Sequence, residues 1–447
     1  MCRNTGINEP REANDRGGAA GAQREAPRCR LRVECVSPRV QYVAFSFCQP
    51  FLRLVPTILL TDPEQRAALA AARSLGRQGW RVMTLGVSRG LAGASRSVVR
   101  NHHISAEDVG VAPRLIAAVA DVVRREQVDV VVPVTDAASR VLLGASAAVG
   151  AIVAGPTADA YARASDKAAL LAVAEQCGLR VPRQLTLTTR ADDHAAAAQV
   201  SGSVVVKPAR SVVEVNGASR SLGVRFVADA SGLDAVLASY PDEAYPLLVQ
   251  ERTFGDGVGV FLLRSGGVTQ MQFAHRRLRE KPPAGGVSTY REAIEPPPAL
   301  LAQCERLLDV LQYEGPAMIE FKQDGRTGDF VLMEINARLW GSLQLAVDAG
   351  VDFPLALVQM ALGHAITPPG PVVAGVRTVW ELGEVDHALA LLRRSREELH
   401  APSTLSVGWR AALRALTDHR WSDRPEVFRW SDPMPFVAEL SRWIRGR

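Results

Sequence analysis

Residues 332–340, which read LMEINARLW, alternate apolar and polar side chains with a period of two. Successive side chains of a β-strand point to opposite faces, so Glu334, Asn336 and Arg338 are expected to share one face. Met333 is expected on the other face, which is apolar and suits a core. The pattern therefore predicts a strand that presents an acid, an amide and a guanidinium to a charged ligand.

A second acid lies on the preceding strand. Glu320 belongs to the run AMIEFKQ, which the turn residues DGRTG separate from the first pattern. The two runs are expected to pair as a hairpin, with Glu320 opposite Glu334 or one step diagonal. Two carboxylates that close repel each other unless a cation lies between them. Because carboxylate and amide oxygens are magnesium ligands, the hairpin predicts a magnesium site at Glu320, Glu334 and Asn336.

The pattern of apolar and helical stretches changes along the chain before these strands. Apolar runs in TILLTD, RVMTLGV and VDVVVPV alternate with helical stretches, which predicts a parallel, doubly wound α/β domain at residues 56–155. Asp62, Thr135 and Asp136 follow strand ends, where ligands bind in such sheets. The first strand is not followed by Gly-x-Gly-x-x-Gly, so a dinucleotide site is not indicated.

Residues 156–365 read instead as paired strands with packed helices, which predicts an antiparallel α+β domain. The stretch SDKAALLAVAEQCGL is expected to form a helix that Asp166 caps and Gly178 ends. The stretch FGDGVG is interpreted as a plain turn. Residues 366–447 begin with the proline-rich stretch TPPGPVV and are expected to form a mixed, mainly helical C-terminal region. Residues 1–55 are expected to form a flexible basic extension.

Bulk composition indicates a soluble globular protein, with 47% hydrophobic and 22% charged residues. Much of the +5 net charge comes from the basic extension, so neither nucleic acid nor a basic binding face is indicated. The six cysteines show no CxxC spacing, which favours reduced thiols in a cytoplasmic protein. Prolines and Arg53 interrupt the apolar segment YVAFSFCQPFLRLVPTILL, which argues against a membrane span or an export signal.

Two lysines precede the acidic hairpin. Lys207 ends the apolar strand SVVVKP, where its ammonium points either into a cleft or into water. Lys167 lies near a helix start, which ordinarily favours acids, so a nearby anion would account for it. Both lysines are therefore candidate phosphate contacts.

Two further stretches suit anions. VNGASRSLG contains Ser219 and Ser221, whose small neighbours let backbone amides approach phosphate oxygens. HRRLREKPPAGGVS gathers His275, Arg276, Arg277, Arg279 and Lys281. Guanidinium groups bind carboxylate or phosphate with two parallel hydrogen bonds. The arginines are interpreted as the side of a cleft that faces the electrophile.

Taken in order, these motifs resemble the ATP-grasp superfamily over about residues 56–365. The resemblance rests on Lys167 in SDKAALLAVAEQCGLRVP, Lys207 in VVVKPA, LVQERTFGDGVGV at the interdomain hinge, Glu320 in MIEFK, and EINARLWGS. HRRLRE is similar to a Gln-Arg-Arg stretch of the carbamoyl-phosphate synthetase and biotin carboxylase branch. The resemblance implies an ATP-grasp fold that follows a pre-grasp domain.

The resemblance also implies roles for matching residues. ATP would contact Lys167, Lys207, Ser219, Ser221, Gln250 and Glu251, and Mg²⁺ (or Mn²⁺) would be held by Glu320, Glu334 and Asn336, with Arg338, Arg276 and Arg279 as catalytic cations. The loop after Lys207 lacks the glycine-rich run of the carboxylase relatives, and the sequence shows no biotin-carrier signature.

The implied activity is an ATP- and magnesium-dependent ligase that activates a carboxylate as an acyl phosphate and forms a carbon–nitrogen bond with an amine. Two alternatives stay open: a bicarbonate-activating carboxylase or carbamoyl-phosphate-synthetase-like enzyme, and a non-catalytic ATP-binding scaffold. The expected partners are small-molecule substrates, with a homodimer as a further option, and neither nucleic acid nor membrane.

Overall fold

The computed structural model describes residues 55–446, apart from 194–195, 197–198, 201, 211 and 216–217. The predicted extension at residues 1–55 therefore lies outside the described part, except for its last residue. Within that part, Cys177 and Cys304 are buried free thiols. A search of the helices in the same part found none with the length and hydropathy needed to cross a membrane.

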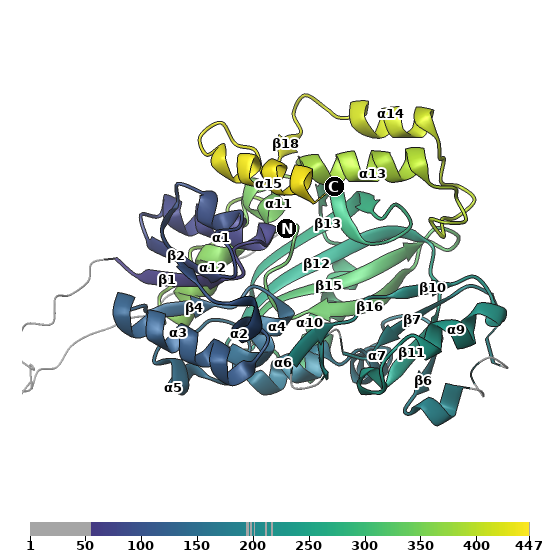
Figure 1. Ribbon diagram of the computed structural model, residues 1–447, viewed down its shortest axis with the longest axis horizontal. Coiled ribbons are helices and arrows are strands. Elements are labelled where there is room, and N and C mark those ends of the chain that lie inside the picture. The colour runs from purple at the N-terminus through teal and green to yellow at the C-terminus, as the bar shows by residue number, and fades with distance from the viewer. Residues whose placement is uncertain are drawn as a thin grey trace, which may run out of the picture. The chain divides into compact units, whose positions relative to one another are not determined.

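The N-terminal part of the fold is the predicted doubly wound parallel sheet (Figure 1). Its strands are β1 (Thr57–Thr61), β2 (Arg81–Gly86), β3 (Val98–His103), β4 (Val130–Val132) and β5 (Ile152–Val153), in the order β3-β2-β1-β4-β5. Its helices are α1 (Arg66–Arg77), α2 (Ala106–Val109), α3 (Ala112–Glu126), α4 (Asp136–Leu142) and α5 (Ser146–Val149).

Side-chain alternation on β1 shows why both faces of this sheet are covered. Ile58 and Leu60 pack with the alanine-rich face of α1, whereas Leu59 packs with α3 on the opposite face. A strand that is buried on both faces reads as a continuous apolar run, as TILLT does. The sequence prediction of this sheet is confirmed, although β3 and β5 were not predicted.

A small antiparallel sheet follows. It contains β6 (Gln184–Leu187), β7 (Val204–Pro208), β10 (Arg225–Val227) and β11 (Leu247–Glu251), in the order β10-β7-β11-β6, with α9 (Leu233–Ala238) beside it. The helices α6 (Ala158–Ser165) and α7 (Lys167–Gln176) precede it, and β8 (Val212–Val215) pairs with β9 (Ala218–Ser221). As predicted, Asp166 caps α7 by accepting hydrogen bonds from the amides of Ala168 and Ala169.

The third sheet has the order β16-β15-β12-β13-β14-β17-β18. Its strands are β12 (Gly255–Ser265), β13 (Val268–Lys281), β14 (Val287–Ile294), β15 (Gly315–Asp324), β16 (Phe330–Asn336), β17 (Arg377–Val379) and β18 (Arg424–Pro425). Between them lie α10 (Pro298–Val310), α11 (Leu343–Asp348) and α12 (Phe353–Ala361). The stretch FGDGVG is not the predicted turn, because β12 already begins at Gly255.

The C-terminal region is mainly helical, as predicted, and it also completes the third sheet. Its helices α13 (Glu381–Arg393), α14 (Trp409–Thr417) and α15 (Met434–Arg445) lie along one side of that sheet in Figure 1. Its short strands β17 and β18 pair beside β14. The segment after residue 366 is therefore packed against the same sheet that carries the acidic hairpin.

Candidate active site

The predicted acid pair is formed by the register of two strands. Glu320 on β15 pairs directly with Glu334 on β16, so both side chains lie on one face of the sheet. The same row continues through Gly259 on β12 to His275 on β13. Of the two expected arrangements, opposite or one step diagonal, the structure has the two acids directly opposite each other.

A register shift next to this pair moves Met333 off the core face. Glu320 pairs with Glu334, but the next residue, Phe321, pairs with Leu332, so Met333 is the extra residue of a β-bulge. Met333 lines a cavity, whereas Leu332 is fully buried in the core. Simple alternation predicted Met333 in the core, and the bulge is the physical reason why that prediction was wrong.

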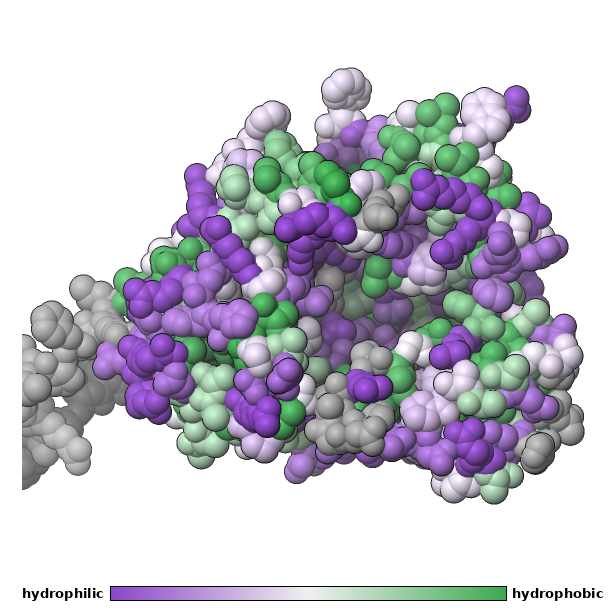
Figure 2. Space-filling model, viewed as in Figure 1, coloured by the Kyte–Doolittle hydropathy of each residue, from purple (hydrophilic) through white to green (hydrophobic). Residues whose placement is uncertain are grey.

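The acid pair faces a cavity of about 530 Å³. In Figure 2 the surface is hollowed near its centre, and hydrophilic residues border the hollow on the face where Figure 1 shows β12, β13, β15 and β16. The lining includes seven residues of the predicted set: Lys207, Gln250, Glu251, Glu320, Glu334, Asn336 and Arg338. One cavity thus brings together residues that are up to 131 positions apart in the sequence (207 to 338).

Two lysines surround Glu334. Nζ of Lys167 lies 3.1 Å from a carboxylate oxygen of Glu334, and Lys207 is buried nearby at the end of β7. The Lys167 charge, aided by Lys207, lowers the pKa of Glu334 to about 2 despite burial. Burial lowers the pKa of Lys207 to about 8, although Glu334 opposes that shift. Glu334 is therefore ionised at neutral pH, whereas the pKa of Lys207 lies close to neutral pH.

Glu320 has a different partner, Arg277, which belongs to the predicted cationic stretch but was not among the predicted catalytic residues. Nη2 of Arg277 lies 2.6 Å from a Glu320 oxygen, and Nη1 donates to Glu280 over 3.0 Å. Burial raises the pKa of Glu320 above its usual range, and the Arg277 charge offsets this only in part. The pKa values of the two acids are therefore shifted in opposite directions, and each acid forms an ion pair with a different cation.

The structure does not bring Arg276 and Arg279 to this cavity. Arg276 donates to Glu292 over 3.0 Å, and Arg279 donates to Glu384 over 2.5 Å. Residues of β13 alternate between faces, so Arg277, two places after His275, lies on the cavity side. Bulges on either side of Arg279 then shift the phase, so that Glu280 lines the cavity and Arg279 does not. Strand alternation would have placed Arg277 and Arg279 on one face, and only the bulges, which the sequence does not reveal, separate the two.

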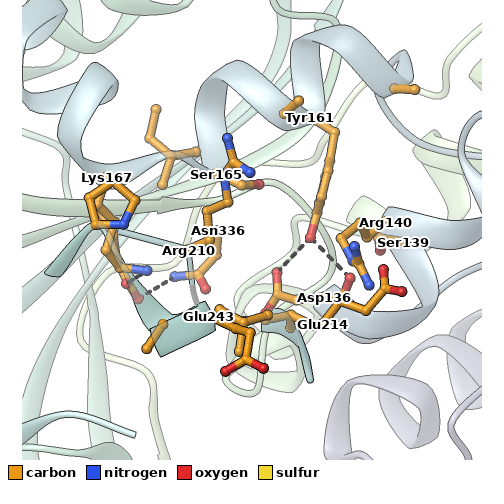
Figure 3. A pocket seen from close by; sticks show the side chains of 18 of the residues that line it. Asp136, Ser139, Arg140, Tyr161, Ser165, Lys167, Arg210, Glu214, Glu243 and Asn336 are labelled. Atoms are coloured by element: carbon orange, nitrogen blue, oxygen red, sulfur yellow. Dashed lines mark hydrogen bonds and ion pairs between the residues drawn. The ribbon is translucent and has the colours of Figure 1, made fainter. Parts of the chain in front are cut away.

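Arg338 connects the acidic hairpin with the parallel sheet. Its Nε and Nη2 donate to one oxygen of Asp136, over 3.0 and 2.9 Å. Asp136 begins α4 directly after β4, and the Tyr161 hydroxyl donates to its other oxygen over 3.2 Å (Figure 3). A residue predicted at a strand end thus orients a predicted catalytic arginine.

Figure 3 shows a second cavity, of about 510 Å³, around this contact. Lys167 lines this cavity, and Glu334 and Asn336 line both cavities, so the two meet at the predicted metal ligands. Ser219 and Ser221 lie on β9, and their side chains are outside the described set. Their predicted contacts with phosphate stay a prediction.

The residues at the acid pair fit a magnesium ion that shares its ligands with phosphates. In the described part of the chain, no group of three or more His, Cys, Asp or Glu side chains could hold a metal. Two carboxylates and the Asn336 carboxamide give three oxygen donors, and magnesium in nucleotide sites takes its remaining ligands from water and phosphate. The donor set suits that metal better than zinc, which prefers nitrogen and sulfur.

Comparison with known proteins supports the fold. Residues 244–383 match the family model described as "ATP-grasp in the biosynthetic pathway with Ter operon". A biotin carboxylase from Campylobacter jejuni, in a β,γ-ATP complex, superposes with a TM-score of 0.56 and 16% identity over 72% of this chain and 74% of its own. No curated protein matches the chain significantly.

Two other solved structures have the same fold. An L-amino acid ligase from Bacillus licheniformis gives a TM-score of 0.55 and 17% identity over 71% of this chain and 75% of its own. An ADP complex of N5-carboxyaminoimidazole ribonucleotide synthetase gives a TM-score of 0.57 and 15% identity over 82% of this chain and 97% of its own. At these identities the likeness establishes the fold.

Proposed function

From the ATP-grasp fold and the family-model match over residues 244–383, we propose that the chain is an ATP-grasp enzyme, an ATP- and magnesium-dependent ligase that joins a carboxylate to an amine. The observation that carries the proposal is the pairing of Glu320 with Glu334 inside a cavity that also holds Lys207 and Arg338. Paired carboxylates between buried cations form a site for a metal with its polyphosphate. Two of the structural neighbours, an L-amino acid ligase and a ribonucleotide synthetase solved with ADP, agree with this class of activity.

The chain's own residues divide the work. Glu320, Glu334 and Asn336 would hold Mg²⁺, with Mn²⁺ as a substitute, and the metal would neutralise charge on the β- and γ-phosphates. Lys167 and Lys207 would hold phosphate oxygens as point charges. The nucleotide base would lie against the strand end at Gln250 and Glu251, which line the same cavity.

The proposed reaction has two steps. A carboxylate oxygen attacks the γ-phosphorus of ATP. This step forms an acyl phosphate and releases ADP. An amine then attacks the acyl carbon, forms the carbon–nitrogen bond and expels phosphate. Arg338, oriented by Asp136, would stabilise the charge that develops on the acyl oxygen. Arg277 takes the role that the sequence analysis gave to Arg276 and Arg279, because it is the arginine of that stretch on the cavity side.

The test is substrate-dependent ADP release. Purified protein with Mg-ATP, pooled carboxylic acids and pooled amines is expected to release ADP only when a suitable acid is present. Glu334→Gln is expected to lower that rate by about 100-fold or more, because the metal loses a charged ligand. Glu292→Gln is the matched control: this carboxylate belongs to the same sheet but is ion-paired with Arg276 and Arg377 away from the cavity.

Other outcomes separate the alternatives. ADP release that bicarbonate stimulates in the absence of any organic acid would replace the ligase with a bicarbonate-activating enzyme. Tight Mg-ATP binding by calorimetry without turnover on any pool would favour a scaffold. Equal ADP release by Glu334→Gln and the unmodified protein would end the assignment of the acid pair.

Three further points accompany the proposal. We propose that residues 56–155 act as a pre-grasp domain and residues 156–365 as the ATP-grasp domain, with 366–447 as an added region. We also propose a cytoplasmic location and a homodimer. Sedimentation of the full chain would test the homodimer.

A further inference from the structure

The larger cavity is walled in part by a guanidinium from the parallel sheet's first helix. Arg66, the first residue of α1, lines this cavity together with Trp340 and Ser342, which follow Arg338 in the chain. Its side chain is only 11% exposed. A positive group thus faces the cavity that also contains the acid pair.

The C-terminal region holds Arg66 in place. Nη1 of Arg66 donates to Glu426, and its guanidinium carbon lies 3.9 Å from the centroid of the Trp380 ring. Glu426 is itself shared, because Arg291 forms an ion pair with its other oxygen. One buried carboxylate therefore serves two buried guanidinium groups, and the carboxyl groups of Glu381 and Glu439 lie close enough to act on the same cluster.

Arg66 keeps donors for another acceptor. Guanidinium has five N–H donors, and among the described residues only Glu426 accepts from Arg66, through Nη1. Nη2 lies close to Gly341: a Cβ added to that glycine would be 3.2 Å away. The absence of a side chain at Gly341 leaves that side of Arg66 open.

A second buried polar group lines the same cavity. His275 is fully buried, and within the described part of the chain neither ring nitrogen has a hydrogen-bond partner. Burial, aided by Arg277 and Arg291, holds its pKa well below 6.5, so the ring is neutral and offers one donor and one acceptor. Buried polar groups without partners are costly unless a ligand or water satisfies them.

From this arrangement we propose that Arg66 and its surroundings bind an anionic group of the organic substrate, so that the acid which is activated carries a second carboxylate or a phosphate. This proposal rests on the ligase function above. One carboxylate of the substrate would lie at Arg338 and the metal ligands, and the second anion would lie at Arg66. Glu426 acts as a positioning residue, because it fixes the guanidinium without lining the cavity.

Arg73 shows what a purely structural arginine looks like on the same helix. It donates from Nε to Asp432 over 2.9 Å, and its Nη atoms donate to the carbonyls of Glu426, Val427 and Asp432. Arg73 is not among the residues that line the cavity. The two arginines both tie α1 to the C-terminal segment, but Arg73 uses four of its five donors there, whereas Arg66 uses one.

The experiment measures ADP release by the full chain with Mg-ATP, an amine pool and matched acids. The pairs are succinate with butyrate, glutarate with valerate, and 3-phosphoglycerate with glycerate. A dianionic acid is expected to have a kcat/KM about tenfold or more above its partner, because an arginine–carboxylate contact is lost in the monoacid. The phosphorylated acid distinguishes phosphate from carboxylate as the second anion.

Variants assign the effect to Arg66. Arg66→Gln is expected to raise KM for the dianionic acid by about tenfold, with KM for Mg-ATP unchanged and with partial rescue in Arg66→Lys. Arg73→Lys, the matched control, should leave both KM values as they are. If it raised KM for the acid as much as Arg66→Gln did, or if monoacids served equally well, the anion site would be wrong and the ligase would stand.

A binding arm decides the case in which no acid supports turnover. The dianionic acids are added to the protein with magnesium and a non-hydrolysable ATP analogue, and thermal unfolding is followed. Protection that Arg66→Gln abolishes and Arg73→Lys keeps would support the anion site even though the ligase had failed. Lack of protection by every dianionic acid, or protection only by bicarbonate or inorganic phosphate, would overturn the anion site.

Discussion

Both the cavity lined by Glu320 and Glu334 and the C-terminal region bury several charges, but Arg73 in the C-terminal region has protein partners of a kind that Lys207 in the cavity lacks. We use "C-terminal clamp" for Arg73, Arg291, Glu381, Glu426, Asp432 and Glu439. In the clamp, the Arg73 guanidinium makes four hydrogen bonds, to Asp432 and to backbone carbonyls. In the cavity, Lys207 is buried and charged with no ion pair of its own among the described residues, so burial depresses its pKa. Arg73 thus has protein partners for most of its donors, whereas Lys207 is left for a ligand to satisfy.

The contrast teaches how to separate stability from function in this fold. Removing one partner of a saturated buried pair leaves an uncompensated charge and destabilises a protein. Removing a buried charge that lacks a full set of partners relieves a cost in the free protein, and the penalty appears only when the ligand binds. Substitutions in the two regions should therefore change opposite observables.

The largest contrast is expected for Lys207→Met. Mg-ATP affinity should fall by about 100-fold, because a buried phosphate contact is lost. The melting temperature should rise, since a buried charge is replaced by an apolar side chain of similar length. Calorimetric titration and thermal unfolding measure the two. Lys281→Met is the control: Lys281 pairs with Asp386 outside the nucleotide site, and its loss should leave Mg-ATP affinity unchanged. A less stable Lys207→Met protein would break the comparison.

The next effect is expected in the clamp. Asp432→Asn should destabilise the protein by about 3 kcal/mol, because the buried Arg73 charge loses its carboxylate. Steady-state kcat and KM of the folded fraction should not change. Urea unfolding measures the first quantity, and the ADP assay measures the second. Asp418→Asn removes an exposed carboxylate 4.0 Å from Arg279 and should cost no more than about 0.5 kcal/mol. A loss of activity without a loss of stability in Asp432→Asn would contradict the division.

A smaller effect is expected from Glu439, which the clamp buries beside Trp380. Burial raises its pKa to about 7, although the Trp380 Nε1–H donates to it over 2.9 Å. The folded protein binds more protons than the unfolded one between the two pKa values, so stability should fall as pH rises from about 4.5 to about 7. Glu439→Gln keeps an acceptor for Trp380 and should flatten this dependence by about 2 kcal/mol between about pH 5 and about pH 8. Parallel pH profiles of the melting temperature in both proteins would contradict it.

The sequence was sufficient for the parts of the site that local pattern specifies. Alternation and the DGRTG turn placed Glu320 opposite Glu334, and the strand-end rule placed Asp136 where it meets Arg338. The helix start at Lys167 followed from the Asp166 cap. These features depend on residues close in sequence or on one rule of sheet topology.

The sequence was not sufficient where space and phase are set by distant strands. The glycines in FGDGVG are needed for room: a Cβ on Gly257 would lie 2.6 Å from Arg277, and one on Gly259 would lie 2.9 Å from the His275 ring. A turn-like composition thus occurs in a strand because side chains of β13 lie over it. The role of Arg66 also depends on the C-terminal region, whose sequence carries no recognisable motif.

The smallest effect is expected for Arg276, and it tests the face of β13 on which catalysis depends. Arg276 is 42% exposed and paired with Glu292, so Arg276→Gln should change kcat/KM by less than about threefold and stability by less than about 1 kcal/mol. Arg277→Gln, one residue along, should reduce kcat/KM by about 100-fold, because Glu320 then loses the cation that holds it. The ADP assay on both variants measures the ratio. If Arg276→Gln were the more damaging of the two, the register of β13 would place the wrong arginine toward the substrate, and the proposed role of Arg277 would fail with it.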